Sequence, residues 1–300
     1  MRLAAVDIGS NTVHVLVADA APEGLRDVAH YVEMPELGAA VARTGEIGEA
    51  KAAEALAALH SVLTKAAAHG YEKLVAGATA AVRKAADGAA LLERASAEAG
   101  VSVRLISGER EAQLSFLGVA SRHAARHDWL MCDLGGGSTE LVAAYNRQMG
   151  SWVSLDLGSG ALAARFLSDP PAAAERASLR ETAVQALRKA PDCAPEKLVA
   201  TGGTATNLPT LLSTDSPPSV LTADALLEVQ RRLDDEPAAA IARRSGLGEG
   251  RVRALRGGVE ILLLLLDYYG LQALHVSHEG LRHGMLLAYL EQGDDWWHVP

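Results

Sequence analysis

One short pattern occurs twice in this 300-residue chain and constrains its fold more than any other feature. The segments Leu3–Asp19 and Leu130–Tyr145 read LAAVDIGSNTVHVLVAD and LMCDLGGGSTELVAAY. Each has an apolar run, then aspartate, an aliphatic residue and glycine, then a small polar turn and a second apolar run. This pattern is typical of a β-hairpin. The repetition indicates one hairpin used in each half of a duplicated fold. The alternative is two unrelated hairpins that share turn chemistry.

Short Val- and Leu-rich runs alternate with alanine-rich helical stretches along the chain. The expected strands are Arg2–Val6, Val13–Asp19, Leu74–Ala78, Val101–Ile106, Trp129–Cys132, Leu141–Tyr145, Trp152–Leu155, Lys197–Ala200 and Ala273–Val276. The expected helices, where helix propensity is high, span residues 49–69, 85–99, 109–125, 172–190, 222–233, 250–269 and 280–291. Alternating strands and helices predict the α/β class.

Composition excludes several classes of protein. Apolar residues make up 49% of the chain, enough for a sizeable core, and the net charge of −9 argues against a nucleic-acid binder. An anionic substrate is still compatible, because a local site can oppose the global charge. The two cysteines, Cys132 and Cys193, make no disulfide framework, which predicts a reducing, cytoplasmic setting. No secretory signal opens the chain, and its most apolar run, Ile261–Leu266, is too short to span a bilayer.

The first hairpin turn, Asp7–Thr12, has the chemistry of a phosphate cradle. Backbone amides and the side chains of Ser10 and Asn11 can donate to phosphate oxygens. Asp7 ends the strand and can bind a hard cation directly or through water. The alternative is an ordinary hairpin turn, which this segment alone would favour.

The second turn, Asp133–Glu140, is more informative because it contains three consecutive glycines. Such a run is entropically costly and suits a backbone that closely approaches a ligand. Asp133 and Glu140 flank the turn on opposite arms of one hairpin, where two carboxylates would repel each other without a cation between them. Mg²⁺ typically takes one or two carboxylates together with phosphate and water. The spacing therefore predicts a magnesium site.

Two further loops lie between an expected strand and an expected helix. Thr201–Thr206 (TGGTAT) opens a helix, and a helix N-terminus with its amides favours anions. Ser277–Gly284 (SHEGLRHG) is a fourth loop of this kind, for which the alternative is a glycine-bearing loop with a surface arginine.

A further helix is expected to begin after Ile106, with Ser107 as its N-cap. Glu109 is explained by capping chemistry in the first turn. Glu111 is the more interesting acid, because a carboxylate near a metal–phosphate site can orient and deprotonate water. The alternative is an ordinary first-turn glutamate.

Several familiar motifs are absent or incomplete. The sequence has no Gly-x-x-x-x-Gly-Lys-Ser/Thr loop. Gly158–Ala163 matches the loose dinucleotide fingerprint, but no acidic-ended second strand follows at the expected distance. His278 and His283 are five residues apart rather than the four of a zincin pair. Cys132 lies in an apolar strand and is interpreted as core packing rather than a nucleophile.

Taken together and in order, these segments resemble the exopolyphosphatase and guanosine pentaphosphate phosphohydrolase (Ppx/GppA) family, in a short two-domain form. The family belongs to the actin, Hsp70 and sugar-kinase superfamily. The resemblance covers almost the whole chain and is carried by Val6–Thr12, Ala78–Arg83, Ile106–Gly108 with Glu111–Ala112, Asp133–Glu140, Thr201–Ala205 and Gly280–Gly284.

The resemblance implies two RNase-H-like (actin-like ATPase) domains, residues 1–121 and 122–300, with an active-site cleft between them. The C-terminal helix is expected to complete the first domain. The resemblance implies Glu111 as the base that activates water and Arg83 as a catalytic cation on the phosphate side. It implies Mg²⁺, with Mn²⁺ as the alternative, near Asp7, Asp133 and Glu140. The expected phosphate-binding positions are Ser10, Asn11, Thr12, Gly136, Gly137, Ser138, Thr139, Gly202, Gly203 and Thr204.

The resemblance implies an exopolyphosphatase of the acid-anhydride hydrolase class, which hydrolyses the terminal phosphoanhydride of inorganic polyphosphate with Mg²⁺ and releases orthophosphate. The alternative is a guanosine pentaphosphate 5′-phosphohydrolase; a non-catalytic phosphate sensor and an ATP-dependent kinase are less favoured. The family also implies a homodimer, while the net charge and the short apolar run predict no nucleic-acid or membrane partner. Two departures stand out. The chain ends at Pro300 without the additional C-terminal helical region of long members, which argues against processive action on long polymers, and His283 replaces the expected acidic residue.

Overall fold

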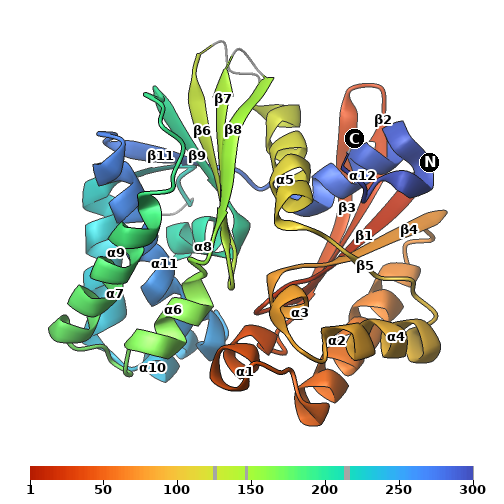
Figure 1. The fold of residues 1–300 in the computed structure, drawn as a ribbon, viewed down its shortest axis with the longest axis horizontal. Coiled ribbons are helices and arrows are strands. Elements are labelled where there is room, and N and C mark those ends of the chain that lie inside the picture. Colours follow the sequence, from red (N-terminus) through yellow and green to blue (C-terminus); the bar gives the residue numbers. More distant parts are fainter. Residues whose placement is uncertain (124–126, 146–147, 213–216, 300) are drawn as a thin grey trace. The chain divides into compact units, whose positions relative to one another are not determined.

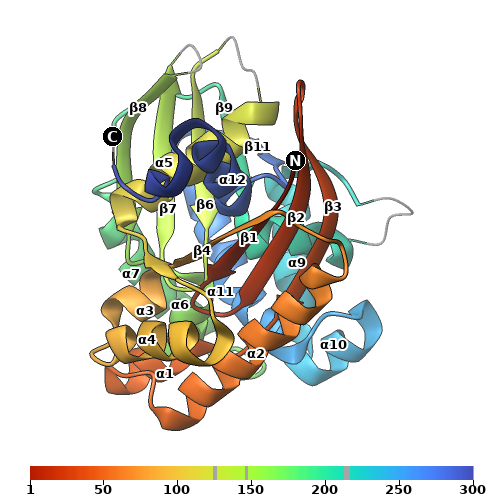
Figure 2. The same cartoon turned by 90° about the vertical axis from the view of Figure 1, so that its right-hand side faces the viewer.

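The computed structural model describes residues 1–123, 127–145, 148–212 and 217–299, shown as a ribbon in Figure 1 and from a second side in Figure 2. The chain divides into two compact units. The first combines residues 1–123 with 279–300, and the second comprises residues 124–278. Each unit has its own β-sheet covered by helices, which makes the protein α/β.

The sheet of the first unit has the strand order β3-β2-β1-β4-β5. Strand β1 pairs antiparallel with β2 and parallel with β4, and β2 pairs antiparallel with β3. The strands span Arg2–Ile8 (β1), Val13–Ala21 (β2), Gly24–Glu33 (β3), Lys73–Ala78 (β4) and Arg104–Leu105 (β5). The first hairpin predicted from the sequence is therefore β1–β2.

Both faces of this sheet are covered, as the side-chain alternation of β1 shows. Ala4, Val6 and Ile8 pack into a core with the helices α2 and α4, whereas Leu3 and Ala5 pack into a second core with α5 and α12. Figure 1 shows the two helical layers on either side of the strands. The helices are α1 (Leu37–Thr44), α2 (Glu49–Ala67), α3 (Ala80–Lys84), α4 (Gly88–Ala99), α5 (Gly108–Arg122) and α12 (Leu281–Gln292), followed by the short η2 (Gly293–Asp295).

The second unit repeats the same hairpin within the sheet order β10-β11-β9-β6-β7-β8. Strand β6 pairs antiparallel with β7 and parallel with β9, as β1 pairs with β2 and β4. The strands span Trp129–Leu134 (β6), Thr139–Tyr145 (β7), Gln148–Leu155 (β8), Lys197–Thr201 (β9), Val220–Thr222 (β10) and Ala273–Val276 (β11). The matching pairing explains why the sequence pattern occurs twice.

One long helix, α11 (Glu249–Tyr268), organises the second unit. Its run Ile261–Leu266 is buried except for the half-buried Leu263, so this run is a core helix, as its length indicates. The other helices of this unit are α6 (Ser159–Phe166), α7 (Ala173–Leu187), α8 (Gly202–Asn207), η1 (Leu208–Leu211), α9 (Ala223–Asp235) and α10 (Ala238–Ser245). Across the described ranges, no helix combines the length and apolar character needed to cross a membrane.

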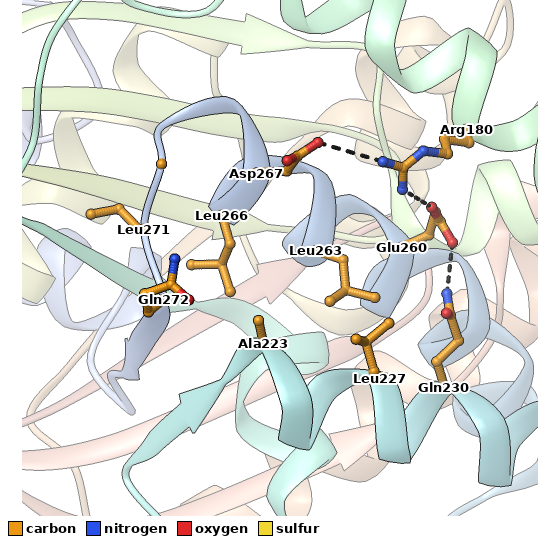
Figure 3. Close-up of a pocket in the computed structure, with 11 residues that line it drawn as sticks. Arg180, Ala223, Leu227, Gln230, Glu260, Leu263, Leu266, Asp267, Leu271 and Gln272 are labelled. Carbon is orange, nitrogen blue, oxygen red and sulfur yellow. Dashed lines mark hydrogen bonds and ion pairs between the residues drawn. The ribbon is translucent and has the colours of Figure 1, made fainter.

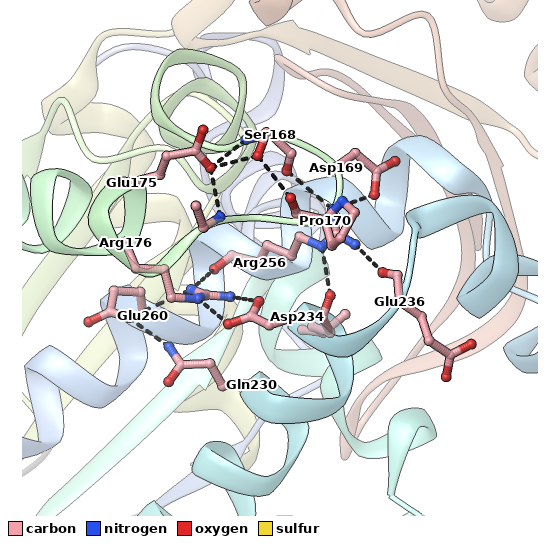
Figure 4. A network of polar contacts seen from close by, with 12 residues as sticks. Ser168, Asp169, Pro170, Glu175, Arg176, Gln230, Asp234, Glu236, Arg256 and Glu260 are labelled. Carbon is pink, nitrogen blue, oxygen red and sulfur yellow. Dashed lines mark hydrogen bonds and ion pairs between the residues drawn. The ribbon is translucent and has the colours of Figure 1, made fainter.

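A polar network fixes α11 to the helices beside it (Figure 4). Arg256, whose side chain is 1% exposed, donates to the carbonyls of Leu233 and Glu236 at 2.9 and 2.7 Å and to Asp169 Oδ1 at 2.7 Å. The Asp169 carboxylate also accepts the Ala238 amide at 2.7 Å. Because the guanidinium reaches both α9 and the loop before α7, it holds α11 at a fixed position in this unit.

The structure differs from the expected elements in places where local signals are weak. Of the expected strand Val101–Ile106, only Arg104–Leu105 form a ladder, although Val101 and Val103 are buried. Strand β3 was not predicted, because it carries exposed polar residues and little apolar alternation. The expected helix 109–125 is observed as Gly108–Arg122, and positions 124 and 125 lie outside the described residues.

Candidate active site

The two hairpins close their turns in the same way. In β1–β2 the Gly9 amide donates to the Thr12 carbonyl at 2.9 Å, and in β6–β7 the Gly135 amide donates to the Ser138 carbonyl at 3.0 Å. Seven of the ten predicted phosphate-binding positions therefore lie on matching turns, Ser10 to Thr12 in one unit and Gly136 to Thr139 in the other.

A helix N-terminus supports each turn from behind. The amides of Ser159 and Ala161 in α6 donate to the carbonyls of Gly135 and Gly136, both at 3.0 Å. Because a trans peptide directs its N–H opposite to its C=O, the N–H groups of Gly136 and Gly137 point away from α6. The turn therefore presents backbone donors on the side opposite its supporting helix, as an anion site requires.

The same support is present in the first unit. The amide of Glu36 donates to the Asn11 carbonyl at 3.1 Å, and the amide of Gly38 donates to the Ser10 carbonyl at 2.6 Å. The start of α1 thus has the relation to the first turn that α6 has to the second.

Gly158 packs against the triple-glycine turn. The sequence pattern had already argued against a dinucleotide-binding role for this glycine. A Cβ atom at this position would overlap the backbone of Gly136 and Gly137. Only a glycine lets α6 approach the triple-glycine turn this closely.

Asp133 and Glu140 are directly opposite each other on β6 and β7, so their side chains share one face of the sheet. Glu140 is 1% exposed and accepts a hydrogen bond from Ser154 Oγ at 2.7 Å. Burial raises the pKa of the neighbouring Cys132 thiol, and the charges of Asp133 and Glu140 raise it further, so Cys132 is an inert core residue.

This carboxylate pair fits a hard divalent cation, because paired oxygen donors are the ligands such ions prefer. In the described parts of the chain, no group of three or more His, Cys, Asp or Glu side chains is placed to hold a metal ion. In the first unit, the residue opposite Asp7 is His14 rather than an acid.

Glu111 and Arg83, both predicted to be catalytic, are in contact. Arg83 Nη1 lies 3.0 Å from Glu111 Oε2 and also donates to the Ile106 carbonyl at 2.6 Å. Glu111 is buried in the first turn of α5, and Ser107 caps that helix by accepting the Arg110 amide, as the sequence predicts. The ion pair orients the Glu111 carboxylate at the start of its helix.

The Thr201–Thr206 loop packs against the end of β6. Gly202 opens α8 with φ of 88°, and a Cβ there would lie 2.9 Å from Asp133 Oδ1. A Cβ at Gly203 would overlap the Nη1 atom of Arg251, which comes from the first turn of α11. The buried Thr204 packs against Gly258 of the same helix.

Arg251 is therefore a candidate site residue that the sequence reasoning missed. Its guanidinium lies against the glycine at which the loop was expected to bind phosphate. In the sequence it is one of several arginines around the start of an expected helix, and no local signal separates it from Arg253 two positions later.

A cavity of about 320 Å³ in the second unit lies elsewhere and contains none of the predicted site residues (Figure 3). Leucines of α9 and α11 form its apolar wall, and Arg180, which pairs with Glu260 at 3.0 Å, lies at one end.

The duplicated hairpins, each within a mixed sheet that has helices packed on it, define an α/β protein of the actin-like ATPase fold. The chain matches the Ppx/GppA phosphatase family over residues 16–292 and belongs to that family.

Named relatives agree with this assignment. Exopolyphosphatase 2 of Mycobacterium tuberculosis is 31% identical, with 96% of this chain and 98% of that protein covered. Exopolyphosphatase 1 of the same species is 29% identical, with 98% and 90% covered. Among solved structures, the Aquifex aeolicus member of the Ppx/GppA family superposes with a TM-score of 0.79 at 27% identity, over 100% of this chain and 99% of that one. An exopolyphosphatase from Cytophaga hutchinsonii, at 23% identity, shares the fold with a TM-score of 0.88, over 97% and 98%.

Proposed function

We propose that this protein is an exopolyphosphatase, which hydrolyses the terminal phosphoanhydride of inorganic polyphosphate and releases orthophosphate. The observation that carries the proposal is the buried Glu111 carboxylate held by Arg83 in a member of a phosphatase family. A carboxylate positioned to activate water favours hydrolysis over phosphate transfer to a bound hydroxyl group. The names of the curated relatives favour polyphosphate over guanosine pentaphosphate as the substrate.

In the proposed reaction, Glu111 accepts a proton from a water molecule as the water oxygen attacks the terminal phosphorus. The bond from that phosphorus to the bridging oxygen breaks, and the shortened polyphosphate leaves with the bond electrons. Arg83 has two roles, since its guanidinium orients Glu111 and can stabilise negative charge on the phosphate. The products are orthophosphate and a chain shorter by one phosphate.

We propose Asp133 and Glu140 as the carboxylates that hold a divalent cation, with Asp7 as a further metal-facing carboxylate. The support is the direct opposition of the first two on one hairpin and their oxygen-donor chemistry. Mg²⁺ is the expected ion and Mn²⁺ the alternative. When bound, the ion would neutralise the charge of the phosphate oxygens.

Phosphate binding is assigned to the two turns and the third loop. The residues are Ser10, Asn11, Thr12, Gly136, Gly137, Ser138, Thr139, Gly202, Gly203 and Thr204. Arg251 joins them, because its guanidinium lies against Gly203. An arginine suits this role, since its planar group donates two parallel hydrogen bonds to phosphate.

We further propose that the enzyme is a cytoplasmic homodimer that acts without nucleic acid or membrane. Both cysteines are free thiols, which fits a reducing compartment, and the charge of −9 disfavours nucleic acid. Sedimentation velocity tests the dimer, since a single species with the mass of one chain would contradict it.

The decisive experiment measures phosphate release with Mg²⁺ from short polyphosphate, long polyphosphate and guanosine pentaphosphate. Wild type, Glu111→Gln and Glu109→Gln are compared, because Glu109 lies in the same helical turn, whereas the ion pair of Arg83 is with Glu111. Release from polyphosphate that only Glu111→Gln abolishes supports the proposal.

The other outcomes are distinct. Release from the nucleotide alone would reassign the substrate. Binding without release from any of the three would indicate a phosphate sensor. Transfer of phosphate from ATP to a hydroxyl acceptor would indicate a kinase.

A further inference from the structure

The C-terminal helix α12 brings a cation to the end of the first strand. Arg282 Nη1 lies 3.7 Å from Asp7 Oδ2, although 275 positions separate the two residues in the numbering. Their side chains are 21% and 15% exposed, so Arg282 is not the surface arginine considered as the alternative from the sequence. Alternation along β1 explains the contact, because Asp7 shares the face on which Leu3 and Ala5 pack against α12.

The position of α12, and hence of Arg282, is closely constrained. A Cβ at Gly284 would overlap the Leu114 carbonyl of α5, and a Cβ at Gly118 would overlap the Gly280 carbonyl. Met285 and Leu286, one turn after Arg282, are fully buried in the core with Leu3. With both helices in contact through glycines, α12 has little freedom to carry Arg282 away from Asp7.

We propose that Arg282 opposes the binding of a bare divalent cation at Asp7, so that metal and phosphate bind cooperatively. This inference rests on the proposed function, in which Asp7 faces the metal. A guanidinium remains charged at all physiological pH values. It therefore repels a second cation at the same carboxylate, and partial burial limits screening by salt.

A polyanionic phosphate substrate removes this conflict. Its oxygens supply negative charge to both the metal and Arg282, so each can be satisfied at once. The affinity for the metal should therefore be high when phosphate is bound and low when phosphate is absent. By linkage, phosphate must strengthen metal binding by the same factor by which the metal strengthens phosphate binding.

The test is isothermal titration calorimetry with Mg²⁺ at fixed ionic strength, first without phosphate and then with inorganic phosphate, corrected for the Mg²⁺–phosphate complex in buffer. The proteins are wild type, Arg282→Gln and Arg43→Gln, the last removing a charge from the exposed Arg43 of α1. Arg282→Gln should tighten Mg²⁺ binding about fivefold or more without phosphate and reduce the gain that phosphate gives. Arg43→Gln should match wild type.

A double-variant comparison locates the effect. In an Asp7→Asn background, Arg282→Gln should no longer change Mg²⁺ affinity, because the shared carboxylate is gone. Unchanged or weaker Mg²⁺ binding in Arg282→Gln overturns the inference. If circular dichroism shows that Arg282→Gln does not fold, the wild-type titrations alone test the inference. Equal Mg²⁺ affinity of the wild type with and without inorganic phosphate would also overturn the inference.

Phosphate release from polyphosphate is measured on the same wild-type preparation. Absence of release would overturn the proposed function while the calorimetry still decides the role of Arg282. Release without the expected calorimetric change would overturn the role of Arg282 alone.

Discussion

Arg83 Nη1 lies 3.0 Å from Glu111 Oε2 and 2.6 Å from the Ile106 carbonyl, so one guanidinium joins α3, the end of the β5 segment and the first turn of α5. The carboxylate is buried and the arginine is 24% exposed. Arg83 therefore anchors the proposed base while retaining access to solvent, and this relation can be tested by substitution.

Glu111→Gln should lower kcat for polyphosphate by about 10²-fold or more, because the amide cannot accept the proton of water. Arg83→Gln should also lower kcat, since it removes the group that orients Glu111. The double variant should lose little more than Glu111→Gln alone, as expected for residues that act as a unit. Steady-state phosphate release checks this, and additive losses would show that the two act independently.

Glu140→Gln should raise the Mg²⁺ concentration at half-maximal activity about tenfold or more, because it removes one of two opposed carboxylates. The matched control is Glu181→Gln, which changes an exposed glutamate of α7. Activity is titrated with Mg²⁺ for each protein. An unshifted titration of Glu140→Gln would remove Glu140 from the proposed metal site.

Gly158→Ala should reduce kcat by about 10²-fold, because the added methyl group must displace the Gly136–Gly137 backbone and a small misplacement of a phosphate cradle is costly. Ser159→Ala is the control, since it removes only the hydroxyl that donates to the Gly135 carbonyl at 3.1 Å. Activity close to wild type in Gly158→Ala, with the fold intact by circular dichroism, would argue against a role for this turn.

Arg251→Gln should raise KM for polyphosphate about tenfold or more, since a hydrogen bond to a charged group contributes about 1.5–3 kcal/mol. Arg253→Gln should leave KM unchanged, because Arg253 is exposed and pairs with Glu249 on the same helix. Initial rates over a range of substrate concentrations distinguish the two. Equal effects of both substitutions would mean that proximity to Gly203 has no consequence for binding.

Asp169→Ala should lower the free energy of unfolding by about 3 kcal/mol at neutral pH, because Arg256 would be left buried without its carboxylate partner. Glu236→Ala, which removes an exposed pair with Arg244, should cost much less, because water and salt screen an exposed ion pair. Urea unfolding measures both, and similar costs would show that the Asp169–Arg256 pair adds nothing.

The same pair should make stability depend on pH. Partial burial by itself would raise the pKa of Asp169, but the Ala238 amide and the Arg256 guanidinium outweigh it and hold this pKa below its usual value. A carboxyl group with a lowered pKa in the folded state adds stability above its unfolded value of about 4 and loses it as the pH falls further. The difference between wild type and Asp169→Ala should therefore shrink below about pH 4. A constant difference across that range would contradict the assignment.

The sequence by itself determined the features that depend on neighbouring residues. The hairpins around Asp7 and Asp133 were predictable, because glycine-containing polar turns between apolar runs specify a hairpin locally. The Ser107 cap and the buried run Ile261–Leu266 follow from capping and from hydrophobic length for the same reason. The family resemblance added the proposed role of Arg83 and favoured Glu111 as the base over an ordinary first-turn glutamate.

Only the tertiary structure decided which distant residues meet. Gly158 touches the Gly136 turn, Arg251 reaches Gly203, and Arg282 reaches Asp7 through packing of helices against sheets. A sequence records no such contacts, because each depends on the crossing of two elements rather than on local propensity. Strand β3 was missed for a related reason, since its polar side chains carry no core-facing pattern and pairing with β2 alone defines it.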